Sequence, residues 1–161
     1  MAQVDYFLKI DGVEGESTDA KHKNQIDVES WSWGAVQSGT QQVGGGGGAG
    51  KVTMQDFHFV MKLTKASPKL MLACANGKHI KLATLTSRRA GKAQQEYLTF
   101  KFSDVLVSSY QTGGSEGSDE PLDQVSLNFR KIEMSYREQK PDGSLGTETK
   151  VGWDLKSSKQ V

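Results

Sequence analysis

The sequence predicts a mainly β protein, a small antiparallel β-barrel or sandwich with one short α-helix and a long Gly-rich extended loop. About eight segments alternate apolar and polar residues, the two-residue period of a half-buried strand. Only one segment carries the start and stop signals of a helix. The 161 residues suit one core, so we expect a single domain spanning residues 1–161.

The first expected strand places four apolar residues on one face: Val4, Tyr6, Leu8 and Ile10. A polar surface loop follows at residues 15–23. The second strand is expected at residues 25–36, where Ile26 and Val28 share one face and Trp31 and Trp33 share the other. This change of phase predicts either a bulge or a strand that is covered on both faces.

The third strand follows the glycine-rich loop, with alternating Phe57, Phe59, Met61 and Leu63. A helix is expected next, because Ser67 is a good N-cap, Pro68 suits the first helical position and Gly77 suits the far end. Its apolar face would hold Leu70, Met71 and Cys74.

Further strands are expected at residues 79–86, 96–102, 104–110, 125–136 and 148–155. Near Arg130 and Lys131 the apolar residues move from odd to even positions, which predicts a bulge or a sharp bend. Residues 112–121 read as an exposed acidic loop and residues 141–144 as a turn. The side chains expected in the barrel core are Trp31, Trp33, Phe57, Phe59, Leu70, Cys74, Phe100, Leu127, Phe129 and Trp153.

Composition excludes several classes of partner. Twenty Lys and Arg nearly balance nineteen Asp and Glu, so we expect no nucleic-acid binding and no membrane insertion. The N-terminal residues lack a basic region followed by an apolar one, so no conventional signal peptide is expected. The single cysteine, Cys74, suits synthesis in a reducing cytoplasm, although composition does not decide whether the protein stays there.

The glycine-rich loop has the spacing of a phosphate-binding loop at Gly45, Gly50 and Lys51. Such a loop needs Ser or Thr next, to bind Mg²⁺, and must then begin a helix. Here Val52 follows, and the next ten residues are typical of a strand. The pattern therefore favours a long glycine-rich hairpin loop over a nucleotide site.

No other motif predicts catalysis, a metal or a cofactor. His22, His58 and His79 have no partner at a recognised metal spacing. Asp27 and Glu29 share a strand face, as two glycosidase acids would, but a solvated strip explains them better. We therefore expect no catalytic, metal-binding or cofactor-binding residues, and no enzymatic activity.

The long loop and the changes of strand phase favour self-assembly, because each is explained by contact with another copy of the chain. A specific resemblance adds to this. The ordered series Gly15-Glu16-Ser17, Ile26-Asp27-Val28, Trp31-Ser32-Trp33-Gly34, Ser67-Pro68-Lys69-Leu70-Met71, Val105-Leu106-Val107-Ser108-Ser109, Leu127-Asn128-Phe129 and Gly152-Trp153 resembles the Hcp (haemolysin-coregulated protein) family of bacterial type VI secretion systems. The resemblance covers nearly the whole chain.

The resemblance implies a β-barrel protomer that forms hexameric rings, which stack into a tube expelled by a contractile sheath. It also implies a VgrG spike at the tip of the tube, effectors carried in the ring lumen and secretion without a signal peptide. A family member would have no enzymatic activity without a fused toxin domain.

By resemblance, ring stacking would fall to Gln41, Gln42, Val43, Gly44, Gly45, Gly46, Gly47, Gly48, Ala49, Gly50 and Lys51. Since Ser32 points away from Trp31 and Trp33, we expect Ser32 to face the lumen. Three alternatives remain: a phage-type tail-tube protein, a monomeric small-ligand-binding barrel, and an enzyme acting through Lys51 or the carboxylates.

Overall fold

A computed structural model describes residues 4–38, 51–90 and 94–161. One helix, α1, spans Ala66–Asn76, and strands make up most of the remainder. The strands are β1 (Val4–Ile10), β2 (Ile26–Asp27), β3 (Ser30–Ser32), β4 (Ala35–Gln37), β5 (Val52–Met54), β6 (Phe57–Lys62), β7 (His79–Arg89), β8 (Glu96–Gly113), β9 (Leu122–Gln139), β10 (Leu145–Asp154) and β11 (Lys159–Gln160).

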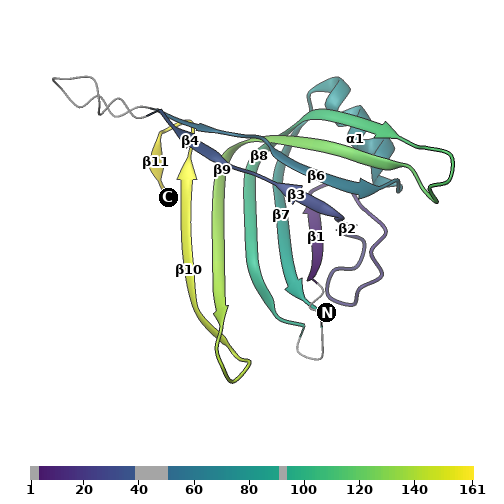
Figure 1. Ribbon diagram of the computed structural model, residues 1–161. Helices are drawn as coiled ribbons and strands as arrows, with labels where there is room; N and C mark the ends of the chain where they lie inside the picture. Colours follow the sequence, from purple (N-terminus) through teal and green to yellow (C-terminus); the bar gives the residue numbers. More distant parts are fainter. Residues whose placement is uncertain (1–3, 39–50, 91–93) are drawn as a thin grey trace.

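All paired strands among these residues are antiparallel. The main sheet runs in the order β11-β10-β9-β8-β7-β1-β2, with β6 added to β9 and β3 added to β6. Figure 1 shows β7 to β10 side by side as a curved wall, with β3 and β6 crossing one end of it. The strands β4 and β5 form a separate two-stranded hairpin.

One short segment, Ile26–Ser32, explains the predicted change of strand phase. Its beginning pairs with β1, where Val28 N–H donates to Tyr6 O at 3.0 Å, and its end pairs with β6, where Glu29 N–H donates to Val60 O at 2.8 Å. The sheet therefore curls around its core, but no ladder joins β1 directly to β6. The predicted antiparallel β class is confirmed, whereas the barrel is not closed.

The core is aromatic. Phe57, Phe59 and Phe102 are fully buried, and the rings of Phe57 and Phe102 lie 4.7 Å apart between centroids. Each such side chain contributes roughly 1.5–3 kcal/mol through its removal from water. These side chains fill the space inside the curled sheet.

The helix differs from its sequence-based description at one end. It begins at Ala66, with Lys65 as the N-cap residue, and the Thr64 hydroxyl accepts from Ala66 N–H at 3.1 Å. Ser67 lies inside the first turn and is buried. Gly77 ends the helix in the left-handed region, with φ of 63°, as the sequence predicts.

The inward face of α1 holds Ala66, Ser67, Leu70 and Ala73, and α1 packs mainly against β8. Met71 was expected on this face, but the structure exposes 55% of it. The reason is geometric, because one residue turns a helix by about 100° and carries Met71 away from Leu70.

The two longest strands run further than the alternation alone predicts. Residues 96–102 and 104–110 belong to one strand, β8, in which Asp104 has a φ of 54° and the register with β9 shifts between Val107 and Ser109. In β9 the predicted change of phase is confirmed, because Phe129 and Ile132 are both buried although they lie three positions apart, where regular alternation would place them on opposite faces. There the carbonyl of Arg130 accepts from Leu155 N–H at 2.8 Å.

Candidate assembly interface

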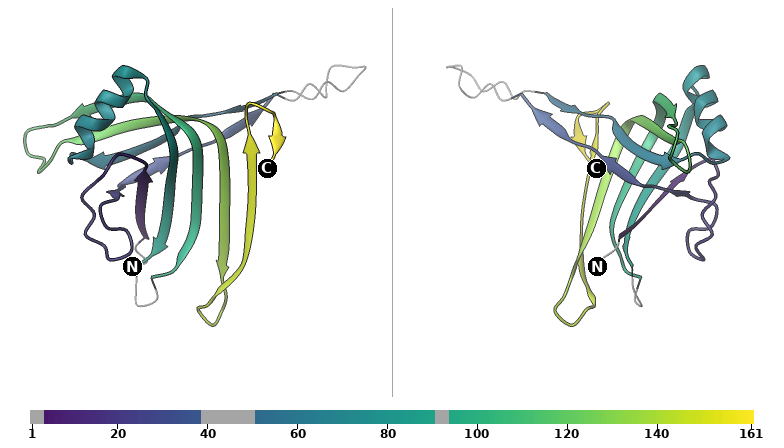
Figure 2. Two further views of the ribbon diagram at one scale, coloured as in Figure 1. Left: turned by 180° about the vertical axis from the view of Figure 1, so that it is seen from behind. Right: turned by 45° about the vertical axis from the view of Figure 1, so that its right-hand side comes forward.

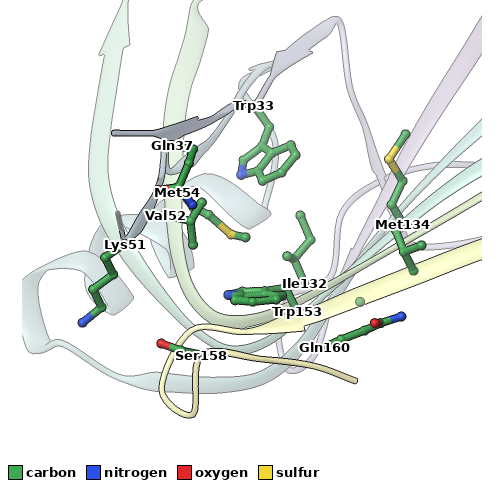
Figure 3. Close-up of a pocket in the computed structure, with 12 residues that line it drawn as sticks. Trp33, Gln37, Lys51, Val52, Met54, Ile132, Met134, Trp153, Ser158 and Gln160 are labelled. Carbon is green, nitrogen blue, oxygen red and sulfur yellow. The ribbon is translucent and has the colours of Figure 1, made fainter. Parts of the chain in front are cut away.

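An apolar groove lies between the β4–β5 hairpin and the outer end of the main sheet. Its volume is about 830 Å³, and Lys51 is the one charged residue among the described residues that line it. Figure 3 shows Trp33, Val52 and Met54 facing Ile132 and Trp153 across this space. The groove therefore offers water a predominantly hydrophobic surface.

The change of phase in β9 creates one wall of the groove. Beyond it Ile132 and Met134 lie on the groove side, and their partners on β10 are Trp153 and Val151. Paired residues on antiparallel strands share a face, so the four side chains form two adjacent apolar rows. Val151 is 56% exposed and Met134 39%, which is high for residues of this kind on a single chain.

Asp154 fixes the turn that follows β10. Its Oδ1 accepts from the N–H groups of Ser157 and Lys156 at 3.2 and 2.9 Å, and its Oδ2 lies 3.4 Å from Arg130 Nη2. The hydrogen bond from Ser157, with the others, lowers the pKa of this carboxyl below its ordinary value. This turn places Ser158 and Gln160 at the rim of the groove.

The β4–β5 hairpin forms the other wall and leads away from the sheet (Figures 1 and 2). All three residues of β4 are exposed, and 57% of Val36 is accessible. Of the expected ring-stacking residues only Lys51 is described, and it is exposed at the groove. The remaining ones, Gln41 to Gly50, lie outside the described residues.

Ser32 belongs to a row of small polar residues on the outer side of the sheet. It is exposed, and the register places it opposite His58, which lies opposite Ser126, which in turn lies opposite Ser109. His58 Nδ1 and Ser126 Oγ are 3.1 Å apart. The row has hydroxyl and imidazole groups but no carboxylate or ammonium group.

The residues expected in the core differ in how far the sheet covers them. Six are buried: Phe57, Phe59, Leu70, Phe100, Leu127 and Phe129. Four are partly buried against that core: Trp31, Trp33, Cys74 and Trp153. Two of these four, Trp33 and Trp153, line the groove.

The histidine and carboxylate side chains considered for catalysis or metal binding do not form a site together. Some already contact other side chains of the protein. His22 is buried, with Nε2 2.7 Å from Glu96 Oε1 and Nδ1 2.9 Å from Gln25 Oε1. Glu29 Oε1 lies 3.9 Å from Lys62 Nζ. Desolvation raises the pKa of Asp27, and the nearby negative charges of Asp5 and Asp19 raise it further.

The charged side chain of Arg88 is engaged within the chain. It is buried at the end of β7, where Nη2 lies 2.9 Å from Asp19 Oδ1 and 3.2 Å from Asp5 Oδ2. Its guanidinium also lies over the Phe7 ring, 4.8 Å from the centroid. Two carboxylates and an aromatic face thus occupy Arg88 within the chain.

Two further findings apply to the described part of the chain. No group of three or more His, Cys, Asp or Glu residues there is arranged to hold a metal ion. No helix there is long and apolar enough to cross a bilayer.

Comparison with known proteins shows which family this chain belongs to. The model of the family described as "Type VI secretion system effector, Hcp" matches residues 7–136. The chain therefore belongs to the Hcp family of type VI secretion proteins. The sequence resemblance is therefore confirmed.

Individual relatives extend the match over the whole chain. Protein hcp1 of Pseudomonas aeruginosa is 48% identical over 160 residues, covering 98% of this chain and 99% of that protein. The crystal structure of Hcp1 from Salmonella typhimurium is 36% identical, covers both chains completely and gives a TM-score of 0.82. A further type six secretion system protein is 31% identical with a TM-score of 0.92, over 99% of this chain and 100% of that one.

Sequence reasoning did not predict the groove, and it assigned two of its lining residues, Trp33 and Trp153, to the barrel core. It placed Ile132 and Met134 after a change of phase, and Trp153 in alternation with Val151. The usable signal was that the two expected strands at residues 125–136 and 148–155 both carry large apolar residues, and that the first of them changes phase near Arg130. Their meeting with Trp33 and Met54 depends on how β4 and β5 leave the sheet, which alternation does not encode.

Proposed function

We propose that this chain is a structural subunit of the type VI secretion tube, forming hexameric rings that stack end to end. In this proposal a contractile sheath exports the tube, a VgrG spike sits at its tip, and effector proteins travel in the ring lumen. The protein would be made in the cytoplasm and leave through the secretion apparatus without a signal peptide. It would act without enzymatic activity or a cofactor.

The observation that carries this proposal is the β4–β5 hairpin. A two-stranded hairpin is marginally stable alone in water, and this one exposes every residue of β4, including the apolar Val36. Contact with a neighbouring copy would cover it. The glycine-rich segment from Gln41 to Lys51 connects its strands, and a stacking role for that segment belongs to the proposal.

The row containing Ser32 supports a lumen wall. A wall without an excess of charge of one sign avoids holding one class of cargo too tightly or repelling another. Ser32, His58, Ser126 and Ser109 form an uncharged row across four strands, and the charged residues further along the same face include both signs: Lys101, Glu133, Glu148 and Lys150. We assign this face to the lumen, with Ser32 in it.

A monomeric small-ligand barrel is less well supported. That function needs an apolar cup inside the barrel. Phe57, Phe59 and Phe102 fill the interior, and the groove lies outside it, beside the hairpin. A phage-type tail tube would share the same assembly physics, but the family match favours type VI secretion.

Electron micrographs of purified protein test the proposal. We expect rings with an open centre, and a Ser32→Cys thiol in a Cys74→Ser background that reacts only with reagents small enough to enter the ring. Lys69→Cys, an exposed position on α1, serves as the reactivity reference for a site outside the lumen. Compact particles without a central opening would contradict ring formation, and rings with an unreactive Ser32→Cys would contradict the lumen assignment alone.

A further inference from the structure

The row of Ser32, His58, Ser126 and Ser109 contains one titratable side chain, the imidazole of His58. His58 is only partly buried, and it pairs directly with Ser32 of β3 on one side and with Ser126 of β9 on the other. Paired side chains on antiparallel strands share a face, with Cβ atoms roughly 5 Å apart. The protonation state of His58 therefore decides whether this row carries a charge.

The next row along the same face is also uncharged. It lies two residues further along each strand, so its side chains point the same way. The register places its four members side by side on β3, β6, β9 and β8: Ser30, Val60, Gln124 and Gln111. The two rows together hold hydroxyl, amide and apolar groups around the single imidazole.

The charged residues on and beside β6 are engaged with other side chains. Asp56 accepts hydrogen bonds at both carboxylate oxygens, from Ser108 Oγ at 2.6 Å and from Asn128 Nδ2 at 3.0 Å. At the far end of β6, Lys62 Nζ lies 3.9 Å from Glu29 Oε1, just before β3. Neither carboxylate nor ammonium group is a recorded partner of His58.

The charged residues further along β8, β9 and β10 occur as pairs of opposite sign. Arg130 Nη1 lies 3.7 Å from Asp104 Oδ2, and Lys150 Nζ lies 3.9 Å from Glu133 Oε2. Histidine is the only side chain whose ordinary titration falls between about pH 5 and pH 8. A proton on His58 is therefore the main change of charge open to the two rows in that range.

The hydrogen bond of His58 allows this change without a movement of the strand. Its Nδ1 lies 3.1 Å from Ser126 Oγ. A hydroxyl can donate to a neutral ring nitrogen and can accept from a protonated one, so both states of the ring keep a partner. His22 differs, because it is buried and its Nε2 lies 2.7 Å from the carboxylate of Glu96.

We propose that this face is a proton-operated contact surface for cargo. Neutral His58 leaves it uncharged, whereas protonated His58 makes it cationic, so that cargo with an acidic surface is held more tightly and cargo with a basic surface less tightly. The proposal rests on the proposed ring with Ser32 in its lumen. There every protomer would repeat the charge around one channel, whose walls of low dielectric focus such a field.

Charged thiol reagents measure the potential beside His58. In a Cys74→Ser background, the Ser32→Cys thiol of intact rings is treated with a methanethiosulfonate that carries a sulfonate, or with one that carries a trimethylammonium group. The ratio of the two rates, sulfonate over trimethylammonium, cancels the pH dependence of the thiol itself. We expect this ratio to rise at least about threefold from about pH 7.5 to about pH 5.5, because a nearby positive charge attracts one reagent and repels the other.

Three variants assign the effect to His58. His58→Gln should keep a low ratio at both pH values, and His58→Lys should keep a high ratio at both. His79→Gln removes an exposed histidine at the start of β7, outside the row, and should retain the wild-type rise. Circular dichroism spectra and electron micrographs check that each variant still folds and forms rings.

A labelled peptide of glutamates tests the class of cargo. Fluorescein-labelled hexaglutamate should bind wild-type rings at least about threefold more tightly at about pH 5.5 than at about pH 7.5, because glutamate remains mostly ionised at both. Rings of His58→Gln should bind it equally at the two pH values. Hexalysine should show the opposite trend with the wild type.

The outcomes separate this proposal from the proposed function. Rings whose Ser32→Cys thiol is size-selective but shows a constant rate ratio, or a rise that persists in His58→Gln, overturn the role of His58 and leave the lumen assignment standing. A rate ratio that rises while hexaglutamate affinity stays constant overturns the cargo selectivity. Particles without a central opening overturn both proposals.

Discussion

Arg88 is the residue that ties the loop between β1 and β2 to the sheet. Its guanidinium contacts Asp19 through both Nη atoms, at 2.9 Å each, and lies over Phe7. The same loop is held by His22 at Glu96. Gly15 permits its close approach, because a Cβ there would lie 2.5 Å from Gln25 O.

The pair formed by Arg88 and Asp19 predicts a dependence of stability on pH. The hydrogen bond from Arg88 lowers the pKa of Asp19 from 3.8 to about 2. A lowered folded-state pKa gives stability that is present above the unfolded pKa and lost as the pH falls through the folded one. The wild type should therefore have a larger free energy of unfolding than Asp19→Asn. This difference should be greatest above about pH 5 and should shrink towards about pH 2.

Urea titrations at several pH values in that window, at one protomer concentration, measure this difference. The control is the same Asp19→Asn change in an Arg88→Met background, where the guanidinium is absent and the dependence should largely disappear. A wild-type difference that stays constant across the window would show that the ion pair does not set the pKa of Asp19.

At the scale of elements, α1 is fixed to the sheet by a buried polar contact. Ser67 Oγ donates to Asp123 Oδ2 at 2.5 Å, and Asp123 is fully buried. Burial raises the pKa of the neighbouring Tyr110, and the negative charge of Asp123 adds to the increase. Because Asp123 Oδ1 has no hydrogen-bond partner among the residues that the structure describes, the carboxylate depends strongly on the Ser67 hydroxyl.

Ser67→Ala should therefore destabilise the protein by about 2–3 kcal/mol, the cost of leaving a buried charged acceptor without its donor. Urea unfolding at fixed protomer concentration measures it as a lower midpoint with an unchanged slope. Ser108→Ala removes a hydroxyl that donates to Asp56 Oδ2 at 2.6 Å on the exposed surface, and should cost about 0.5 kcal/mol or less. Equal losses in the two variants would mean that burial of Asp123 is not what gives Ser67 its importance.

The sequence predicted those elements whose signals are local. Alternation placed the strands around Phe57 and Phe59, Gly77 marked the end of α1, and the shift between Phe129 and Ile132 marked the bend in β9. It did not predict that the segment 26–32 pairs first with β1 and then with β6, because pairing between strands far apart in the chain leaves no periodic signal. It also placed Met71 on the same face of α1 as Leu70, since apolar character alone does not distinguish the two faces of the helix, and the structure exposes Met71.

The candidate site was predicted in its parts but not in its arrangement. The two-residue period of a strand placed the Ser32 side chain on the other face from Trp31 and Trp33. The structure exposes Ser32. The row from Ser32 to Ser109 could not be foreseen, because it requires the register of β3, β6, β9 and β8 together.

For the whole molecule, three exposed features remain unexplained by the protomer alone. The β4–β5 hairpin projects from the sheet, the groove beside it is lined mostly by apolar side chains, and α1 presents an apolar outer face. In the proposed ring, contacts between copies of the chain would cover these surfaces.

The mass of the native particle tests the central claim, self-assembly into a ring, most directly. Native mass spectrometry of the purified protein at about micromolar concentration should give six chains of 17.6 kDa, with no stable population of dimers or trimers. A closed ring explains that result, because every protomer in it satisfies both of its surfaces. A mass of one chain, unchanged as the concentration is raised, would contradict the account.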